Sequence, residues 1–213
     1  MIIKYFEFNP FAENTYILSD NSNEAIIIDP GCYEKKEQEI LKTYVAENDL
    51  NVVKLYNTHC HIDHVLGNSF VKDAYNVDLV IHKDDEPLLR SVVSYAPNYG
   101  FAAYREALAD EYYSEGDVVK FGNSELEVIH VPGHAPGHVA LIHHGSRSVI
   151  NGDVLFLNSI GRTDLPGGDY DTLIDSIQSK LFNLPDDYTV YCGHGPTTTI
   201  GYEKRTNPFC KII

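Results

Sequence analysis

Apolar runs and apolar periodicity divide the first part of the chain into alternating strands and a helix. Residues 2–8, 14–18 and 52–56 are rich in β-branched and aromatic residues, and residues 25–29 form a short apolar run before a Pro-Gly turn. Runs of this kind are typical of strands. Residues 34–48 instead space their apolar side chains three and four apart among many charges, which predicts an amphipathic helix.

The rest of the chain continues this alternation. We expect a strand at 78–82 and helices at 65–75, 83–90 and 169–182, while the Tyr-rich segment 91–115 fits a helix, a lid or a substrate wall equally well. Strands punctuated by helices predict two sheets sandwiched between helices, although periodicity alone does not separate this from other layered α/β folds. The remaining expected strands are 117–121, 124–131, 138–143, 147–151 and 188–192.

Length and composition indicate one globular domain over residues 1–213, because no linker, repeat or low-complexity tract interrupts the chain. Hydrophobic residues make up 43% and charged residues 22%, so disorder is not expected. No apolar run approaches the ~18–20 residues that span a bilayer. The N-terminus lacks the pattern of a signal peptide. We therefore expect no membrane association and no leader.

Charge and cysteine usage narrow the cellular setting. The four cysteines, Cys32, Cys60, Cys192 and Cys210, form no Cys-x-x-Cys pair, which indicates reduced thiols in the cytoplasm. The formal net charge is -15 at pH 7. An acidic surface repels phosphate backbones, so nucleic-acid binding is disfavoured.

The strongest chemical signal is the segment THCHIDH, which follows the expected strand at 52–56. His59 and His61 are two residues apart, so an extended backbone points both imidazoles to one side. Asp63 and His64 follow directly. A His-rich surface turn is the alternative, but three His and one Asp within six residues after a buried strand is rare by composition. Imidazole and carboxylate ligands suit zinc, iron or manganese.

Three further candidate ligands follow later strands. His134 lies in VPGHAPGH, Asp153 in INGDVLF and His194 in VYCGHGP, and each comes directly after a glycine. Glycine permits tight turns and close backbone approach. A site built from several strand ends is a common way for a layered scaffold to present functional groups.

The pattern HxHxDH followed by single His, Asp and His residues resembles the metallo-β-lactamase superfamily, and ENTY near the start and GHGP near the end fit as well. The resemblance implies a four-layer αββα sandwich with two divalent metal ions at one edge. Zinc is the expected metal, and iron and manganese suit the same ligands. The implied ligands are His59, His61 and His134 for the first metal, Asp63, His64 and His194 for the second, and Asp153 between them.

Within the superfamily, residues 152–169 and 193–209 most resemble the short single-domain members of the glyoxalase II group. Longer members carry a C-terminal helical domain that grips glutathione, and this chain, which ends at Ile213, is expected to have none. The β-lactamases proper have a cysteine where Asp153 stands, which argues against β-lactam hydrolysis.

The resemblance implies hydrolysis of a small-molecule thioester such as S-lactoylglutathione by a metal-bridging hydroxide. Asp153 would act as ligand, and Asp63 would also accept a proton. The segment GRTD also resembles persulfide dioxygenases, which use one iron, and this is the main alternative. A non-catalytic metal-binding module is expected to lack a ligand, whereas all seven are present. The sequence identifies no substrate-binding residue and no oligomeric state.

Several neighbouring residues allow narrower predictions. His138, four residues after His134, either orients a ligand or has a plain structural role. Cys60 should point away from the two imidazoles and into the core. Arg162 and Asp164 are expected to brace their loop rather than to react, either with or without an ion pair between them.

Two groups of residues near the expected 83–90 helix allow further predictions. Tyr95, Tyr99 and Tyr104 either wall a substrate pocket or belong to the core. The acidic run 84–86 is expected to be a solvated helix surface.

Overall fold

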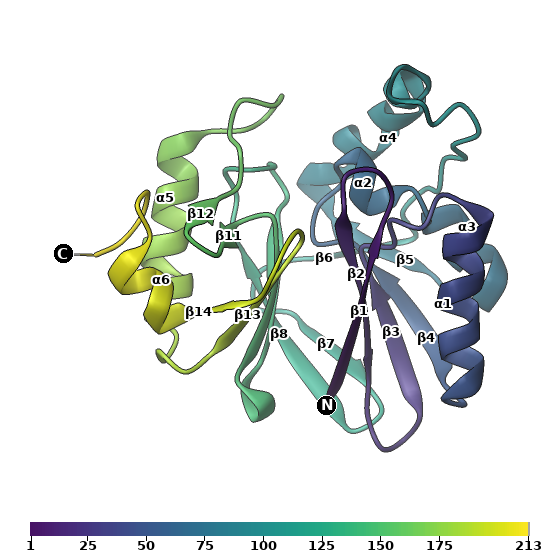
Figure 1. The fold of residues 1–213 in the computed structure, drawn as a ribbon, viewed down its shortest axis with the longest axis horizontal. Helices are drawn as coiled ribbons and strands as arrows, with labels where there is room; N and C mark the ends of the chain where they lie inside the picture. Colours follow the sequence, from purple (N-terminus) through teal and green to yellow (C-terminus); the bar gives the residue numbers. More distant parts are fainter. Residues whose placement is uncertain (213) are drawn as a thin grey trace. The chain divides into compact units, whose positions relative to one another are not determined.

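Two six-stranded sheets organise the protein in the computed structural model, which describes residues 1–212 (Figure 1). The chain divides into two compact units. Unit 1 consists of Met1–Tyr113 with Lys120–Ser124, and unit 2 of Ser114–Val119 with Glu125–Ile213. The single domain expected over residues 1–213 stays a prediction.

The first sheet has the strand order β1-β2-β3-β4-β5-β6. Its first three strands are antiparallel, and β3 to β6 run parallel to one another. Parallel strands need crossover connections, which helices provide here. The strands are β1 (Ile2–Phe8), β2 (Glu13–Ser19), β3 (Glu24–Ile28), β4 (Asn51–Tyr56), β5 (Leu79–His82) and β6 (Glu111–Tyr113).

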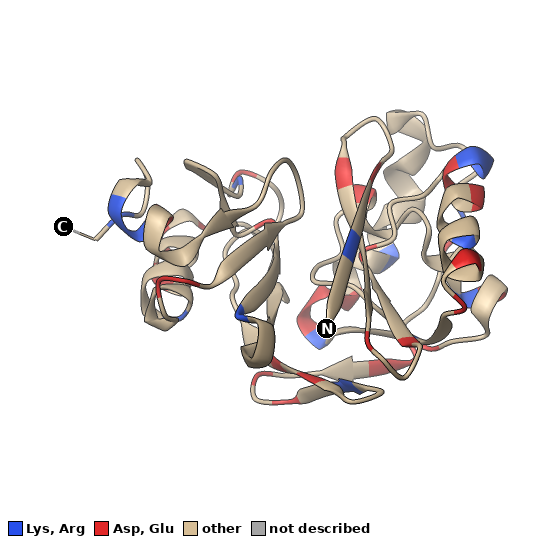
Figure 2. Ribbon diagram, turned by 60° about the horizontal axis from the view of Figure 1, so that its bottom comes forward, with Lys and Arg blue, Asp and Glu red and all other residues tan. Residues whose placement is uncertain are grey.

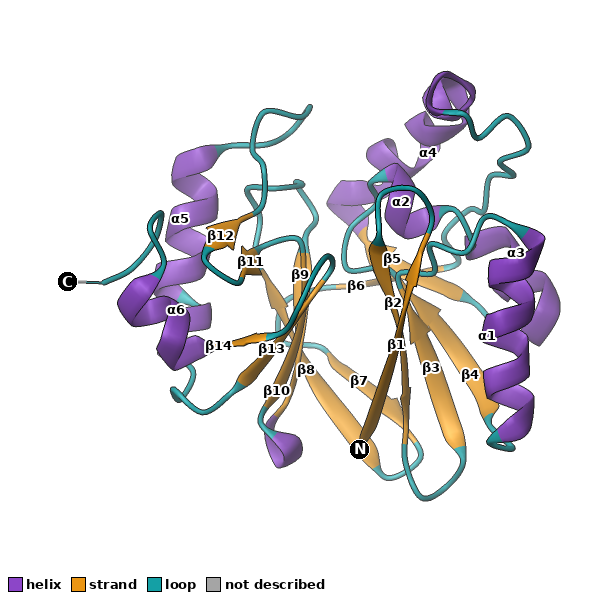
Figure 3. Cartoon of the chain, in the orientation of Figure 1, coloured by secondary structure: helices purple, strands orange, loops and turns teal. Residues whose placement is uncertain are grey.

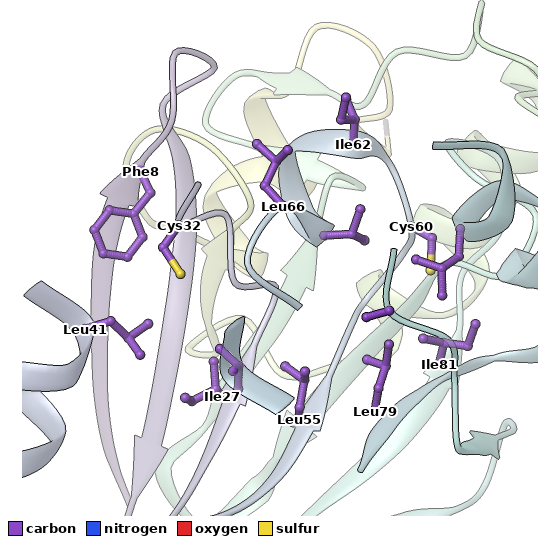
Figure 4. Packing of buried hydrophobic residues seen from close by; sticks show 14 of the residues in the cluster. Phe8, Ile27, Cys32, Leu41, Leu55, Cys60, Ile62, Leu66, Leu79 and Ile81 are labelled. Atoms are coloured by element: carbon purple, nitrogen blue, oxygen red, sulfur yellow. The ribbon is translucent and has the colours of Figure 1, made fainter. Parts of the chain in front are cut away.

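Helices of unit 1 share a core with alternate residues of this sheet. Ile27, Leu55 and Leu79 pack with Leu41 and Val71 from two of the helices, and all five side chains are fully buried (Figure 4). The outer face of the first helix carries both charge signs (Figure 2). The helices are α1 (Lys35–Glu47), α2 (Ile62–Val65), α3 (Asn68–Tyr75), η1 (Lys83–Asp85), α4 (Glu86–Tyr95) and η2 (Ala96–Tyr99).

The second sheet has the order β14-β13-β10-β9-β8-β7 and is mostly antiparallel, with β10 and β13 parallel. The strands β11 and β12 form a separate two-stranded ribbon (Figure 3). The strands are β7 (Val118–Phe121), β8 (Ser124–His130), β9 (Val139–His143), β10 (Ser148–Gly152), β11 (Leu155–Phe156), β12 (Ser159–Ile160), β13 (Thr189–Cys192) and β14 (Thr198–Thr199).

Two helices complete the core of unit 2. Leu173 and Ile177 of one, and Ile200 of the other, pack with Val149 and Val190 of the sheet, and all five are fully buried. None of the helices in the described part of the chain is long and apolar enough to cross a membrane. The helical segments are η3 (His144–Ser146), α5 (Tyr170–Ser179), η4 (Leu181–Asn183) and α6 (Ile200–Thr206).

The helix expected at 65–75 is wrong in one respect, because two helices occupy this region. The first begins at Ile62, inside the ligand motif, and α3 begins only at Asn68. Gly67 lies between them, and its N–H donates to the carbonyl of Pro30 at 2.7 Å. A Cβ at this position would lie 2.6 Å from Cys32 Sγ, so the chain approaches too closely here for a larger residue.

Candidate metal centre

The buried carboxylate of Asp29 organises the ligand loop of unit 1. It accepts hydrogen bonds from the backbone N–H of Thr58 at 2.7 Å and from the Thr58 hydroxyl at 2.6 Å. Its Oδ2 also lies 3.2 Å from His64 Nδ1. The side chain is 1% exposed, so these bonds act in an environment of low dielectric constant. The sequence analysis missed this residue, although its place directly after β3 was a usable signal.

The imidazoles of unit 1 form one cluster. The ring of His59 lies 4.1 Å from that of His64 and 4.9 Å from that of His61, measured between centroids. His59 Nδ1 lies 3.2 Å from the Thr58 hydroxyl, and His64 Nδ1 faces Asp29. A ring fixed through Nδ1 presents Nε2, the usual arrangement of a metal-ligating histidine.

Asp63 lies at the more open side of this cluster. Its Oδ2 is 3.7 Å from His64 Nε2, and its side chain is 14% exposed. The β1–β2 turn holds the backbone here, since Asn9 Nδ2 donates to the Asp63 carbonyl at 3.0 Å. Burial raises the pKa of Tyr95 to about 12, and the charge of Asp63 adds to this rise.

A second buried carboxyl group supports the cluster from β2. Glu13 is fully buried, and burial raises its pKa well above the usual value, although the nearby His64 opposes the rise. Its Oε2 accepts from the Thr15 hydroxyl at 2.9 Å, and that hydroxyl accepts from the Gly31 N–H at 2.8 Å. These hydrogen bonds give the first and third residues of the ENTY segment a structural role beside the ligand loop.

Two of the three predicted ligands in unit 2 are imidazoles that approach one oxygen atom of the third, Asp153. Asp153 Oδ2 lies 3.6 Å from His134 Nε2 and 3.5 Å from His194 Nε2. The backbone carbonyl of Arg162 fixes His134, because its oxygen lies 2.7 Å from His134 Nδ1. A Cβ on Gly161 would lie 1.9 Å from the Asp153 carbonyl oxygen, so only glycine fits beside this ligand.

The neighbours of these ligands bear on the narrower predictions. His138 is fully buried, and its Nε2 accepts from the backbone N–H of Asp153 at 3.0 Å, so it holds a ligand's backbone. Its ring also lies edge to face with that of His134, with centroids 5.8 Å apart. The ion pair between Arg162 and Asp164 is present and bidentate, at 2.8 and 2.7 Å. Arg162 holds the pKa of Asp164 down to about 2.

The prediction for the acidic run 84–86 is wrong at its centre. Asp85 is fully buried, and its Oδ2 accepts from the Cys60 N–H at 2.7 Å, whereas the Asp84 carboxylate is 61% exposed. Cys60 itself points into the core of unit 1 beside Ile81, as alternation predicts (Figure 4).

The donor atoms suit a divalent cation. Imidazole Nε2 atoms and carboxylate oxygens gather in each unit, which is the ligand set of zinc, iron and manganese sites. Asp29, His59 and His64 also offer ligand atoms within 4.8 Å of one another. Both Asp29 oxygens already accept hydrogen bonds, however, so we assign Asp29 to holding His64.

The three tyrosines considered as a substrate wall divide into two groups. Tyr95 and Tyr99 stack edge to face at 5.8 Å, and Tyr99 also contacts Phe11 of the β1–β2 turn at 6.2 Å. Tyr104 instead lines a cavity of about 650 Å³ with Tyr33 and Phe70, and none of the seven predicted ligands lines this cavity. The donor geometry locates the chemistry better than cavity size does. A substrate role for Tyr95 and Tyr99 stays a prediction.

The chain is similar to known proteins over nearly its whole length. The model of the metallo-beta-lactamase superfamily matches residues 8–194. Hydroxyacylglutathione hydrolase GloC of Haemophilus influenzae is 40% identical over 211 residues, which cover 98% of this chain and 98% of that protein.

Solved structures are similar over nearly the whole chain. BLEG-1 B3 metallo-beta-lactamase has a TM-score of 0.87 at 33% identity and covers 98% of this chain and 99% of its own. TTHA1623 in a di-iron-bound form has a TM-score of 0.86 at 35% identity, and the match covers 97% of this chain and 99% of that one. ETHE1 from Myxococcus xanthus has a TM-score of 0.82 at 27% identity, covering 99% and 84%. These likenesses confirm the predicted α/β fold of the metallo-β-lactamase type.

Proposed function

The chain belongs to the metallo-β-lactamase superfamily and is a metal-dependent hydrolase of that fold, and from this premise we propose a dinuclear centre that cleaves thioesters. The observation that carries the proposal is the approach of two imidazole Nε2 atoms to Asp153 Oδ2, at 3.5 and 3.6 Å. A carboxylate with imidazoles around one oxygen suits a ligand shared by two cations.

We assign the ligands as the family pattern implies. Two features support the assignment. All seven positions carry a residue that binds divalent metals, and the fixed Nδ1 atoms of His59, His64 and His134 leave Nε2 for a metal. His59, His61 and His134 would hold the first metal, Asp63, His64 and His194 would hold the second, and Asp153 would serve both.

The bound metals would lower the pKa of a water molecule and polarise the substrate carbonyl. Asp63 is the side chain we assign to accept the proton of the attacking water, because it is partly exposed and turned toward His64 Nε2. A thioester needs no strong general acid, since its thiolate leaves readily. The name of GloC supports an S-acyl glutathione such as S-lactoylglutathione as the substrate.

We propose zinc as the metal, with iron or manganese as alternatives. The likeness to TTHA1623, which was solved in a di-iron-bound form, supports keeping iron among them. We also propose a cytoplasmic location, because all four cysteines are buried thiols that form no disulfide. The proposed partner is a small-molecule thioester rather than a nucleic acid or a membrane.

A mononuclear-iron persulfide dioxygenase is the second candidate. The likeness to ETHE1 of Myxococcus xanthus and the intact Arg162–Asp164 pair in GRTD support keeping it. It differs in two measurable respects, because it consumes oxygen and needs a single iron.

Thiol release from S-lactoylglutathione by the metal-loaded protein tests the proposal. We expect turnover that a chelator abolishes, and no turnover in His59→Ala or Asp153→Ala. His144→Ala is the matched control, since this histidine is exposed and bonded to Glu127, and it should keep the wild-type rate. A chromogenic β-lactam belongs in the same assay, because the name of BLEG-1 makes lactam hydrolysis the relevant competitor. Full activity with two metals in Asp153→Ala would contradict the assignment.

A further inference from the structure

We propose that Asp85 is a positioning residue that sets the geometry of His59 and His61 through the backbone N–H between them. The inference deepens the metal-binding part of the proposed function and rests on it. It starts from a buried carboxylate at the junction of η1 and α4. Asp85 is the last residue of η1 and has helical φ and ψ of -93° and -4°.

The side chain of Asp85 makes no capping hydrogen bond to α4. Its Oδ2 instead accepts from the N–H of Cys60 at 2.7 Å, a bond that joins residues 25 apart in the chain. The carboxylate therefore reaches out of its own helical segment to the ligand loop.

The position of Cys60 explains what that bond controls. The residue lies between His59 and His61, and its own side chain is buried in the core beside Ile81 (Figure 4). The core fixes one side of Cys60, and Asp85 fixes its N–H. With both in place the Cys60 peptide is held, and the two flanking imidazoles lie side by side, with ring centroids 4.9 Å apart.

Burial makes this bond costly to lose. Asp85 is fully buried, whereas the neighbouring Asp84 carboxylate is 61% exposed. A buried N–H without an acceptor loses far more free energy than one that faces water. The loop would relieve the loss by rotating the peptide before Cys60, which carries the His59 carbonyl, and the two Nε2 atoms would then diverge.

Unit 2 contains a comparable device. His138 Nε2 accepts from the backbone N–H of Asp153, again holding a predicted ligand through its main chain. In both units a buried side chain from another segment fixes the peptide of the ligand loop. Side-chain contacts to ligand rings would not reveal this, because the control acts on the backbone.

The test compares Asp85→Ala and Asp85→Asn, with Asp84→Asn as the matched control. Asparagine keeps an acceptor oxygen at the same reach, so it should restore what alanine loses. The readouts are the cobalt dissociation constant, measured by competition with a chelator, and the visible spectrum of the cobalt-loaded protein. We expect Asp85→Ala to bind cobalt about 10- to 100-fold more weakly with altered d–d bands. Asp85→Asn should stay within about threefold of wild type, and Asp84→Asn should be unchanged.

The outcomes separate this inference from the proposed function. If the wild-type protein binds no cobalt, the proposed metal site fails. If the wild type binds cobalt and Asp85→Ala matches it in affinity and spectrum, the positioning role is overturned and Asp85 serves folding only. Equal damage in Asp85→Asn and Asp85→Ala would also overturn it, since the acceptor oxygen would then not be the cause. Should Asp85→Ala not fold, Asp85→Ser, whose hydroxyl is too short to reach Cys60, replaces it.

Discussion

Replacing Asp29 by alanine should destabilise the metal-free protein more than any substitution on its surface. The carboxylate is 1% exposed and holds Thr58 through two short hydrogen bonds, at 2.6 and 2.7 Å. It also lies 3.2 Å from His64 Nδ1. Alanine removes the acceptor and leaves these three buried donors, and the more distant Asn57 Nδ2 at 3.5 Å, facing a small void.

The size of the effect follows from these three contacts. A hydrogen bond to a charged group contributes about 1.5–3 kcal/mol, and removing one member of a buried network costs about 3–5 kcal/mol in total. We therefore expect the free energy of unfolding to fall by about 4 kcal/mol. Asp29 also has a φ of 49°, a left-handed conformation in which alanine is strained.

Urea denaturation of the chelated protein at neutral pH measures the loss without any contribution from metal binding. Asp29→Gly is the control for backbone strain, because glycine accepts a positive φ freely. If the hydrogen bonds dominate, Asp29→Gly should lose nearly as much stability as Asp29→Ala. A loss below about 1 kcal/mol in both variants would refute the role given to Asp29, because a loss that small equals one ordinary hydrogen bond. Recovery in the glycine variant alone would assign the effect to strain.

Three further predictions concern other parts of the chain. The four cysteines are buried, and burial raises the pKa of Cys192 and Cys210 to about 12, so none should react with an aromatic disulfide reagent until urea unfolds the protein; fast reaction of any thiol in the native state would contradict this. Burial works against ionisation of Asp20, but its hydrogen bonds from Ser22 and from residues 123–124 outweigh it and lower the pKa. A lowered pKa stabilises the fold above the unfolded value, about 3.9, and this stabilisation is lost as pH falls below it. Asp20→Asn should therefore cost about 1 kcal/mol at pH 7, after allowance for solvent screening, and the difference from wild type should shrink below pH 4; an equal difference at pH 7 and pH 3 would exclude the linkage. Gly133 has a φ of 125°, and a Cβ there would lie 2.3 Å from the Leu173 nitrogen, so Gly133→Ala should lose about 3 kcal/mol or more of stability. Gly100→Ala, with a φ of 91° and open space around it, should lose only about 1 kcal/mol, and equal losses would show that the close approach is unimportant.

The sequence predicted most strands well because strands depend on local patterns, and the same kind of pattern underlies the predicted ligands. Strands such as β3 and β4 are short apolar runs that tertiary packing only reinforces. The ligand candidates are unusual clusters of His and Asp at strand ends, and such clusters are visible without a structure. The break at Gly67 was not predicted, because it depends on the approach of Pro30 and Cys32 from another segment.

Support of the ligands from other segments was the larger omission. The acidic run 84–86 resembles ordinary solvated helix surface, and only the path of the chain buries Asp85 while leaving Asp84 exposed. The His134 partner is a backbone carbonyl, that of Arg162, and no side-chain pattern encodes a carbonyl. Local sequence patterns therefore supply the candidate ligands, whereas the fold determines which groups hold them in place.

Metal content per chain tests the central claim most directly. Elemental mass spectrometry on the purified, metal-loaded protein should find about two divalent metal ions per chain, which is the stoichiometry of a bridged hydrolase site. A single iron per chain, with no second ion even at excess metal, would contradict the dinuclear hydrolase and favour the oxygen-consuming alternative.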